Sequence, residues 1–100
     1  MSLTIIKKMN EEIPVLALEG RLDTITAPEL EKEISELSDD VKGLVIDMEK
    51  LEYVSSAGLR VILKAYKTLS SKEGLKIVNA SDDIKEVFNI TGFSDFLTIE

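Results

Sequence analysis

Short apolar segments that alternate with stretches of helical periodicity limit the folds open to this chain. Residues 15–18 form an apolar run of strand length, and residues 44–48 and 75–78 are apolar except for Asp47 and Lys76. The first two segments are apolar enough to predict strands covered on both faces. Over residues 30–37 and 59–69, apolar side chains recur every three or four positions and define one face of a helix. Strands joined by such helices pair in parallel through right-handed crossovers. The pattern therefore predicts an α/β fold with a mixed, mostly parallel sheet.

The two ends of the chain add further elements. Residues 3–9 predict an edge strand, and the polar turn at residues 10–12 makes it an antiparallel hairpin with the strand that follows. Ser81 is a candidate N-cap for a third helix, which Gly92 is placed to end. The tail at residues 93–99 is too apolar to stay exposed, so we expect it to dock on the rest of the domain.

The first helix carries a start signal in its sequence. Thr26 with Glu29 three residues later predicts a capping box, and Pro28 fits the first helical turn. The polar residues 38–40 are expected to end this helix.

The composition narrows the class of function. Apolar residues make up 44% of the 100 residues, which is enough for one core, so we expect a single domain over residues 1–100. The net charge of −7 argues against binding to nucleic acid or to an anionic membrane, and it favours a protein partner with a basic face. The chain has no cysteine and no apolar run of membrane-spanning length, which predicts a cytoplasmic protein.

Several kinds of chemistry are also excluded. The sequence has no histidine, so the commonest general base near neutral pH is missing, and no imidazole or thiolate can hold a metal. Its glycines form no nucleotide-binding loop. We therefore expect no enzyme activity, no cofactor and no metal. Asp23, Asp47 and Glu49 leave open a carboxylate-based metal or acid–base site, although a solvated edge explains them more simply.

The stretch SSAG at residues 55–58 opens the long helix with four small side chains. Ser55 or Ser56 is a candidate N-cap. Gly58 falls in the first turn, where it costs up to about 1 kcal/mol relative to alanine. It predicts either close packing of the helix on a strand or close approach by another molecule.

The positions of two loops point to the same region. Residues 22–24 and 49–56 each follow a strand, and parallel pairing is expected to bring them to one rim of the sheet. A helix start at this rim is electropositive, so a phosphoserine in its first turn would be tolerated by the fold.

Three motifs resemble those of the STAS domain, in particular those of the stand-alone anti-sigma factor antagonists of bacteria. They are GRLDTITAPEL at residues 20–30, LVIDM at 44–48 and YVSSAGLRVIL at 53–63, and the likeness covers nearly the whole chain. The resemblance implies a STAS fold and a partner switch. In that family the unmodified antagonist binds an anti-sigma factor that is also a serine kinase, which frees the sigma factor. The kinase phosphorylates the antagonist with its own ATP, the complex separates, and a metal-dependent serine phosphatase resets the antagonist.

The same resemblance assigns the site residues. The phosphorylated residue corresponds to Ser56; many antagonists have an aspartate where this chain has Ser55, and Ser55 is the alternative acceptor. A monomer is expected, because the partner supplies the other surface. The alternative function is a STAS scaffold or interaction module in a larger signalling or transport complex, without phosphorylation. The implied partner-binding residues are Asp23, Thr24, Ser55, Ser56, Ala57, Gly58 and Arg60.

Overall fold

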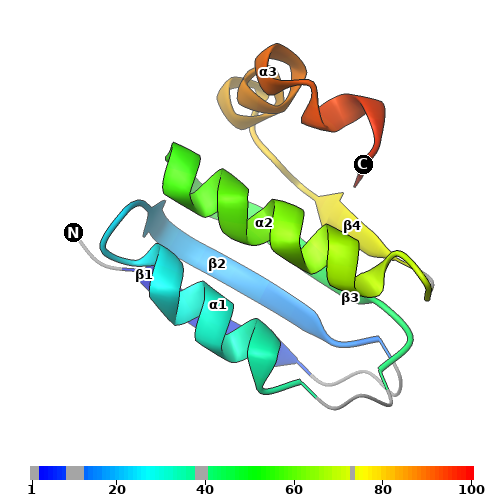
Figure 1. Ribbon diagram of the computed structural model, residues 1–100. Coiled ribbons are helices and arrows are strands. Elements are labelled where there is room, and N and C mark those ends of the chain that lie inside the picture. The colour runs from blue at the N-terminus through cyan, green and yellow to red at the C-terminus, as the bar shows by residue number, and fades with distance from the viewer. Residues whose placement is uncertain (1–2, 9–12, 38–40, 73) are drawn as a thin grey trace.

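A five-stranded sheet in the order β1-β2-β3-β4-β5 forms the centre of the described part of the protein, as the computed structural model in Figure 1 shows. The structure describes residues 3–8, 13–37, 41–72 and 74–100. The described elements are β1 (Leu3–Lys8), β2 (Val15–Leu22), α1 (Ala27–Ser35), β3 (Leu44–Val54), α2 (Ser56–Leu69), β4 (Leu75–Val78), α3 (Asp82–Thr91), a 3-10 turn (Phe93–Asp95) and β5 (Thr98–Ile99). The predicted turn at residues 10–12 and the predicted helix end at 38–40 lie outside the described residues.

The pairing of the strands confirms the predicted fold class. β1 pairs with β2 antiparallel and is an edge strand, while β2 with β3, β3 with β4, and β4 with β5 all pair in parallel. Each parallel pair from β2 to β4 is joined through a helix, as a parallel crossover requires. The fold is therefore a mixed α/β sheet that begins with an antiparallel hairpin.

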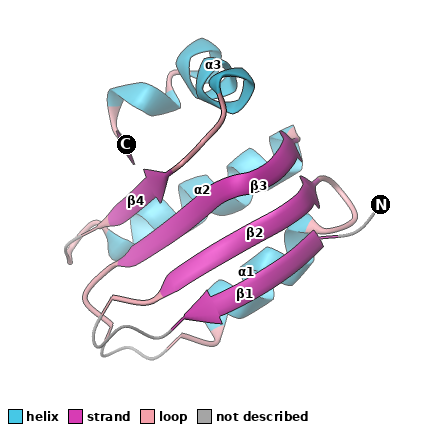
Figure 2. Ribbon diagram, turned by 180° about the vertical axis from the view of Figure 1, so that it is seen from behind, coloured by secondary structure: helices cyan, strands magenta, loops and turns pink. Residues whose placement is uncertain are grey.

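Both α1 and α2 lie on the same face of the sheet. Figure 1 shows them in front of the strands, and Figure 2 shows the opposite face of β1, β2 and β3 without a helix over it. The prediction that residues 15–18 and 44–48 are covered on both faces is therefore wrong. Leu16 and Ile46 are fully buried beneath the helices, whereas Val15 and Val45 point to the other side and are only half-buried.

The core fills the space between the sheet and these two helices. Leu30 of α1 and Ile62 of α2 are completely buried against strand residues. Burial of one such side chain contributes about 1.5–3 kcal/mol to folding. In the described residues, no helix combines the length and the apolar character needed to cross a lipid bilayer.

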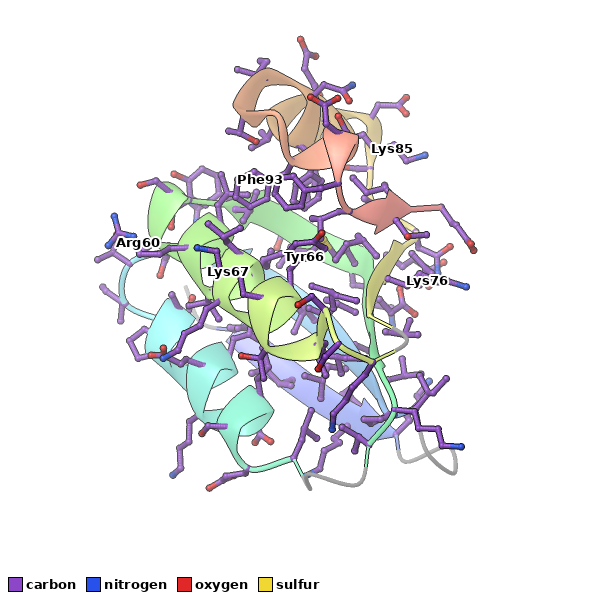
Figure 3. The ribbon with its side chains drawn as sticks, turned by 45° about the vertical axis from the view of Figure 1, so that its right-hand side comes forward. Arg60, Tyr66, Lys67, Lys76, Lys85 and Phe93 are labelled. Carbon is purple, nitrogen blue, oxygen red and sulfur yellow. The ribbon has the colours of Figure 1, made fainter. Side chains whose placement is uncertain are left out.

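The last helix and the tail follow the predicted signals. Ser81 caps α3 by accepting a hydrogen bond of 3.3 Å from the Ile84 amide, and Gly92 ends the helix in the left-handed conformation at φ 84°. The tail docks as expected: Leu97 is buried, and Thr98–Ile99 adds a short strand that the sequence did not predict. Tyr66 of α2 and Phe93 of the 3-10 turn lie in this region (Figure 3), and the Phe96 ring is 4.8 Å from the Tyr66 ring and 5.3 Å from the Phe93 ring, measured between centres.

Candidate functional site

The carboxyl ends of β2 and β3 meet at one rim of the sheet. Leu22 pairs with Val54 at the ends of the two strands, and the Ser55 amide donates a hydrogen bond of 2.8 Å to the Leu22 carbonyl. The predicted convergence of the two loops is thus confirmed. The predicted loop at residues 49–56 is too long, however, because β3 continues to Val54 through its pairing with β2.

The loop after β2 is held by its own side chains. The Asp23 carboxylate accepts hydrogen bonds from the amides of Ile25 and Thr26, each at 3.0 Å. The Thr26 hydroxyl accepts from the Asp23 amide at 2.8 Å and donates to the Arg21 carbonyl at 2.8 Å. These bonds fix the shape of the loop before any partner arrives.

This network also replaces the predicted capping box. Thr26 precedes α1, but its side chain makes no cap hydrogen bond to the helix, and its backbone is helical rather than extended. Because its hydroxyl is bonded within the loop, it does not reach the helix amides. The prediction of a capping box between Thr26 and Glu29 is therefore wrong.

The same contacts lower the pKa of the Asp23 carboxyl from its ordinary value of 3.8. The largest cause is the hydrogen bond from the Thr26 amide, and the Thr26 hydroxyl, the Ile25 amide and the nearby Arg21 act in the same direction. Partial desolvation opposes them. Asp23 is therefore ionised at neutral pH, with its carboxylate already engaged by the loop.

At the start of α2, the two serines have different roles. Ser55 is the N-cap: its backbone is extended and its hydroxyl accepts a hydrogen bond of 3.3 Å from the Gly58 amide. Ser56 is the first helical residue and is exposed. Among the described residues, the Ser56 hydroxyl has no hydrogen-bond partner. The hydroxyl of Ser55 serves the helix, and that of Ser56 is available to solvent.

Gly58 is buried beneath this surface, where α2 presses on the ends of the strands. A β-carbon at position 58 would lie 2.7 Å from Cγ of Leu22 and 3.1 Å from a methyl group of Val54. Of the two explanations open for this glycine, close packing of the helix on the strands is the one that the geometry supports. Gly58 thus lets the start of α2 sit against the end of β2.

A shallow groove joins the loop after β2 to the start of α2. It has a volume of about 380 Å³, and Thr24, Pro28, Ala57 and Arg60 are among the residues that line it. Thr24 and Arg60 are exposed, and Ala57 is half-buried. Three of the predicted contact residues therefore share one surface between α1 and α2.

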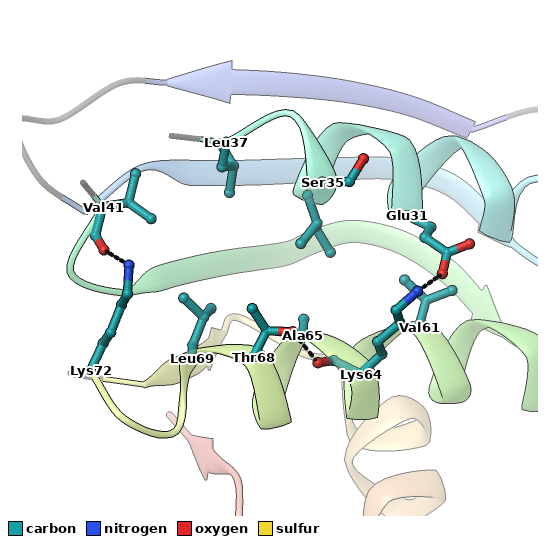
Figure 4. Close-up of a pocket in the computed structure, with 11 residues that line it drawn as sticks. Glu31, Ser35, Leu37, Val41, Val61, Lys64, Ala65, Thr68, Leu69 and Lys72 are labelled. Carbon is teal, nitrogen blue, oxygen red and sulfur yellow. Dashed lines mark hydrogen bonds and ion pairs between the residues drawn. The ribbon is translucent and has the colours of Figure 1, made fainter. Parts of the chain in front are cut away.

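A second groove continues between the same two helices (Figure 4). It has a volume of about 260 Å³ and shares Glu31, Val61 and Lys64 with the first groove. The Lys64 ammonium group lies 2.8 Å from the Glu31 carboxylate and connects α2 to α1 across the space. The charge of Lys64 is thus already paired within the protein.

Two features of the site were missed by the sequence analysis. Ile25, at the tip of the loop after β2, is 82% exposed. Arg21 lies 4.3 Å from the centre of the Tyr53 ring and 4.0 Å from the Asp23 carboxylate. Ile25 belongs to no apolar periodicity, and an apolar residue between two threonines in a loop was the signal available for it.

The three carboxylates considered for a metal or acid–base site do not converge. Asp47 pairs with Ala17 in the sheet, whereas Asp23 follows Leu22, five residues further along β2. The Asp47 carboxylate accepts hydrogen bonds from the Glu49 amide and from the Asn79 side chain. Within the described residues, no group of three or more acidic, histidine or cysteine side chains is arranged to hold a metal ion.

Comparison with known sequences identifies the family. The STAS domain profile matches residues 4–100. An anti-sigma-B factor antagonist of Bacillus subtilis is 29% identical over 100 residues, which cover 99% of this chain and 92% of that protein. The protein BtrV of Bordetella bronchiseptica is 35% identical over 81 residues, which cover 79% of this chain and 70% of that protein.

Solved structures show the same arrangement of strands and helices. An anti-sigma factor antagonist from Mycobacterium paratuberculosis matches with a TM-score of 0.88 at 26% identity, over 97% of this chain and 84% of that one. The Bacillus cell fate determinant SpoIIAA in its phosphorylated form matches with a TM-score of 0.75 at 22% identity, over 97% of this chain and 91% of that one. At this identity the match shows a shared fold. On the profile match over nearly its whole length, this chain belongs to the STAS domain family.

Proposed function

We propose that this chain is an anti-sigma factor antagonist whose binding is switched off by phosphorylation of Ser56. The observation that carries the proposal is the contrast between the two serines at the start of α2. Ser56 is exposed and its hydroxyl is available, whereas the Ser55 hydroxyl is used to cap the helix. The names of the relatives that match over nearly the whole chain support the choice of partner.

In its unmodified form, the protein binds an anti-sigma factor in the cytoplasm and so releases a sigma factor. The contact surface is the rim formed by Thr24, Ala57 and Arg60, with the exposed Ser56 beside them. Asp23 and Ser55 shape this rim through their hydrogen bonds, and the buried Gly58 seats α2 beneath it. A monomer is sufficient, since the partner provides the second surface.

Phosphorylation adds a phosphate to Ser56, which leaves the fold intact but weakens the complex with the anti-sigma factor. The anti-sigma factor acts as a serine kinase: the Ser56 hydroxyl oxygen attacks the γ-phosphorus of ATP, the bond to ADP breaks, and the hydroxyl proton passes to a base of the kinase. At the first turn of α2 the added charge is favoured by about 0.3–1 kcal/mol through the helix dipole. The mark therefore acts on the partner rather than on the fold.

The effect on the partner is large by comparison. A carboxylate of the partner about 5 Å from the phosphate dianion would be repelled by roughly 5–7 kcal/mol at an effective dielectric constant of about 20. Since about 1.4 kcal/mol changes affinity tenfold, half of this repulsion is enough to separate the complex. A serine phosphatase then adds water across the O–P bond, which returns the serine hydroxyl and inorganic phosphate.

Mass spectrometry tests the acceptor directly. The purified protein is incubated with ATP and a candidate anti-sigma kinase from the same organism, and the modified residue is located by peptide fragmentation. We expect phosphate on Ser56, no modification of Ser56→Ala, and modification of Ser55→Ala at Ser56. Phosphate found on Ser55 instead of Ser56, or away from both residues, would refute the site.

Calorimetry tests the switch. Ser56→Asp should weaken binding to the anti-sigma factor by an order of magnitude or more, because its carboxylate places a negative charge at the same position. Ser70→Asp, at the exposed far end of α2, is the matched control and should bind normally. Equal affinity of Ser56→Asp and the unmodified protein would contradict the charge mechanism. Failure of every form to bind such a partner would instead favour a scaffold role.

A further inference from the structure

Arg60 follows Ser56 by four residues on α2, so that the two side chains are neighbours on one face of the helix. Both residues are exposed, and the Arg60 side chain projects outward from the first half of α2 (Figure 3). A phosphate on Ser56 would lie within reach of the guanidinium group, which binds phosphate oxygens through two parallel hydrogen bonds.

Arg60 also differs from the other cations of this region. Arg21 lies against the Tyr53 ring and near the Asp23 carboxylate, and Lys64 is paired with Glu31. Arg60, by contrast, makes no ion pair with any residue that the structure describes. Its side chain lines the groove on which the proposed contact surface is built. A charged group of the partner can therefore reach it without displacing an internal ion pair.

We propose that Arg60 is an exchangeable counter-ion that pairs with a carboxylate of the anti-sigma factor in the unmodified complex and with the phosphate of Ser56 after phosphorylation. This inference rests on the proposed function of Ser56. Phosphorylation then weakens the complex twice, because the partner's carboxylate meets a new negative charge and also loses its cation. The partner is thereby specified as a protein with an acidic residue opposite the first turns of α2.

Distance along the helix provides a sharp control. Ser56 and Arg60 are separated by about 6 Å along the axis of α2, whereas Ser56 and Lys67 are separated by about 16 Å. The screening length is about 8–10 Å at physiological to 0.1 M ionic strength, so Arg60 lies inside it and Lys67 outside. Lys67 is likewise exposed, on the same helix, and carries the same charge. A comparison of substitutions at Arg60 and at Lys67 therefore separates a direct ion pair with the phosphate from a general effect of positive charge on the helix.

The experiment measures the phosphate itself, without the kinase. Phosphoserine is inserted at position 56 during translation, and the second ionisation of its phosphate is followed by ³¹P NMR as a function of pH. In the protein with Arg60 we expect this pKa to lie below its usual value near 6. Arg60→Gln should raise it by roughly half a pH unit, equivalent to about 0.7 kcal/mol, and Arg60→Lys should give an intermediate value.

Lys67→Gln should change the phosphate pKa by no more than about a third of the change caused by Arg60→Gln, because the charge of Lys67 is screened. The other charged groups of the loop after β2 and of the groove, namely Arg21, Asp23, Glu31 and Lys64, are the same in every variant, so their effects cancel in the comparison. Equal shifts for Arg60→Gln and Lys67→Gln, or no shift for Arg60→Gln, would overturn the pairing.

A second measurement tests the other half of the exchange. Binding of the unphosphorylated Arg60→Gln variant to the anti-sigma kinase should be roughly 5–30-fold weaker than that of the wild-type protein, with Lys67→Gln unchanged. Unchanged binding of Arg60→Gln would refute the carboxylate contact. The NMR result does not depend on whether Ser56 is phosphorylated by a kinase, so the inference and the proposed function fail by different outcomes.

Discussion

The backbone amide of Ser55 donates a hydrogen bond of 2.8 Å to the carbonyl of Leu22. This bond joins the last residue of β2 to the N-cap of α2, although 33 positions separate them in the sequence. The loop that follows Leu22 and the helix that follows Ser55 are thereby fixed relative to each other. A partner that contacts both meets a surface that is already assembled, which lowers the ordering cost of binding.

The two serines should respond differently when each is replaced by alanine. Ser55→Ala removes the N-cap hydrogen bond to the Gly58 amide and should lower the free energy of unfolding by about 1 kcal/mol. Ser56→Ala removes an exposed hydroxyl and should change it by less than about 0.5 kcal/mol. Urea unfolding followed by circular dichroism provides the comparison. A larger loss for Ser56→Ala would show that the assignment of the cap is wrong.

Gly58→Ala should destabilise the protein although alanine is the better helix former. The added methyl group would meet Leu22 Cγ at 2.7 Å, and such overpacking costs about 1–3 kcal/mol against a propensity gain of about 1 kcal/mol. We expect a lower denaturation midpoint with an unchanged denaturant slope.

A double-mutant cycle isolates the contact responsible. Leu22→Ala removes the atoms nearest to the new methyl group, so Gly58→Ala should be much less destabilising in that background, where only the 3.1 Å contact with Val54 remains. Additive effects of the two substitutions would mean that the cost of Gly58→Ala arises elsewhere.

The hydrogen bonds of the Asp23 carboxylate should make the stability of the protein depend on pH in the acid range. Because the pKa of its carboxyl is lowered in the folded protein, its contribution to stability is complete above the ordinary value of 3.8 and is lost as pH falls through the folded value. Asp23→Asn should therefore be less stable than the wild-type protein at pH 7, and the difference should shrink as the pH falls below 3.8. Unfolding curves at several pH values test this, and a difference independent of pH would contradict it.

Ile25 should contribute to binding without contributing to folding. Its side chain is 82% exposed on a loop held by hydrogen bonds, so Ile25→Ala should leave the unfolding midpoint unchanged. If it fills an apolar pocket of the proposed partner, the substitution should weaken binding by about 1–2 kcal/mol, or roughly 5–30-fold. The matched control is Ile90→Ala on α3, where the isoleucine is 77% exposed and lines a groove made by α3 residues alone. Equal effects of the two substitutions would remove Ile25 from the contact surface.

Local patterns in the sequence were sufficient to predict the alternation of strands and helices, but not the coverage of the sheet. Val15 and Ala17 are apolar, which favours strands buried on both sides, yet both face the side without helices. Apolar character alone does not distinguish a half-buried face from a covered one. That information lies in the placement of α1 and α2, which no local pattern contains.

The errors at the site arise from interactions between distant residues. Glu49, Lys50 and Glu52 interrupt the apolar run of β3 and predict a loop, but pairing with β2 keeps the strand extended to Val54. The hydroxyl of Thr26 matched a helix cap in the sequence, whereas the fold brings the Arg21 carbonyl within its reach. The start of α2 was predicted because a serine N-cap is a local feature, in which the Ser55 hydroxyl accepts from an amide only three residues along the chain.

The sheet face without helices gives experimental access to the protein. Thr4 on β1 is exposed and alternates with Leu3 and Ile5, which contribute to the core on the helix side. Since the chain has no cysteine, Thr4→Cys would provide a single thiol for a fluorophore or a sensor chip. A molecule tethered there would be held through the face opposite α1 and α2, so that the proposed association, modification and release at Ser56 could be recorded in real time on one immobilised sample.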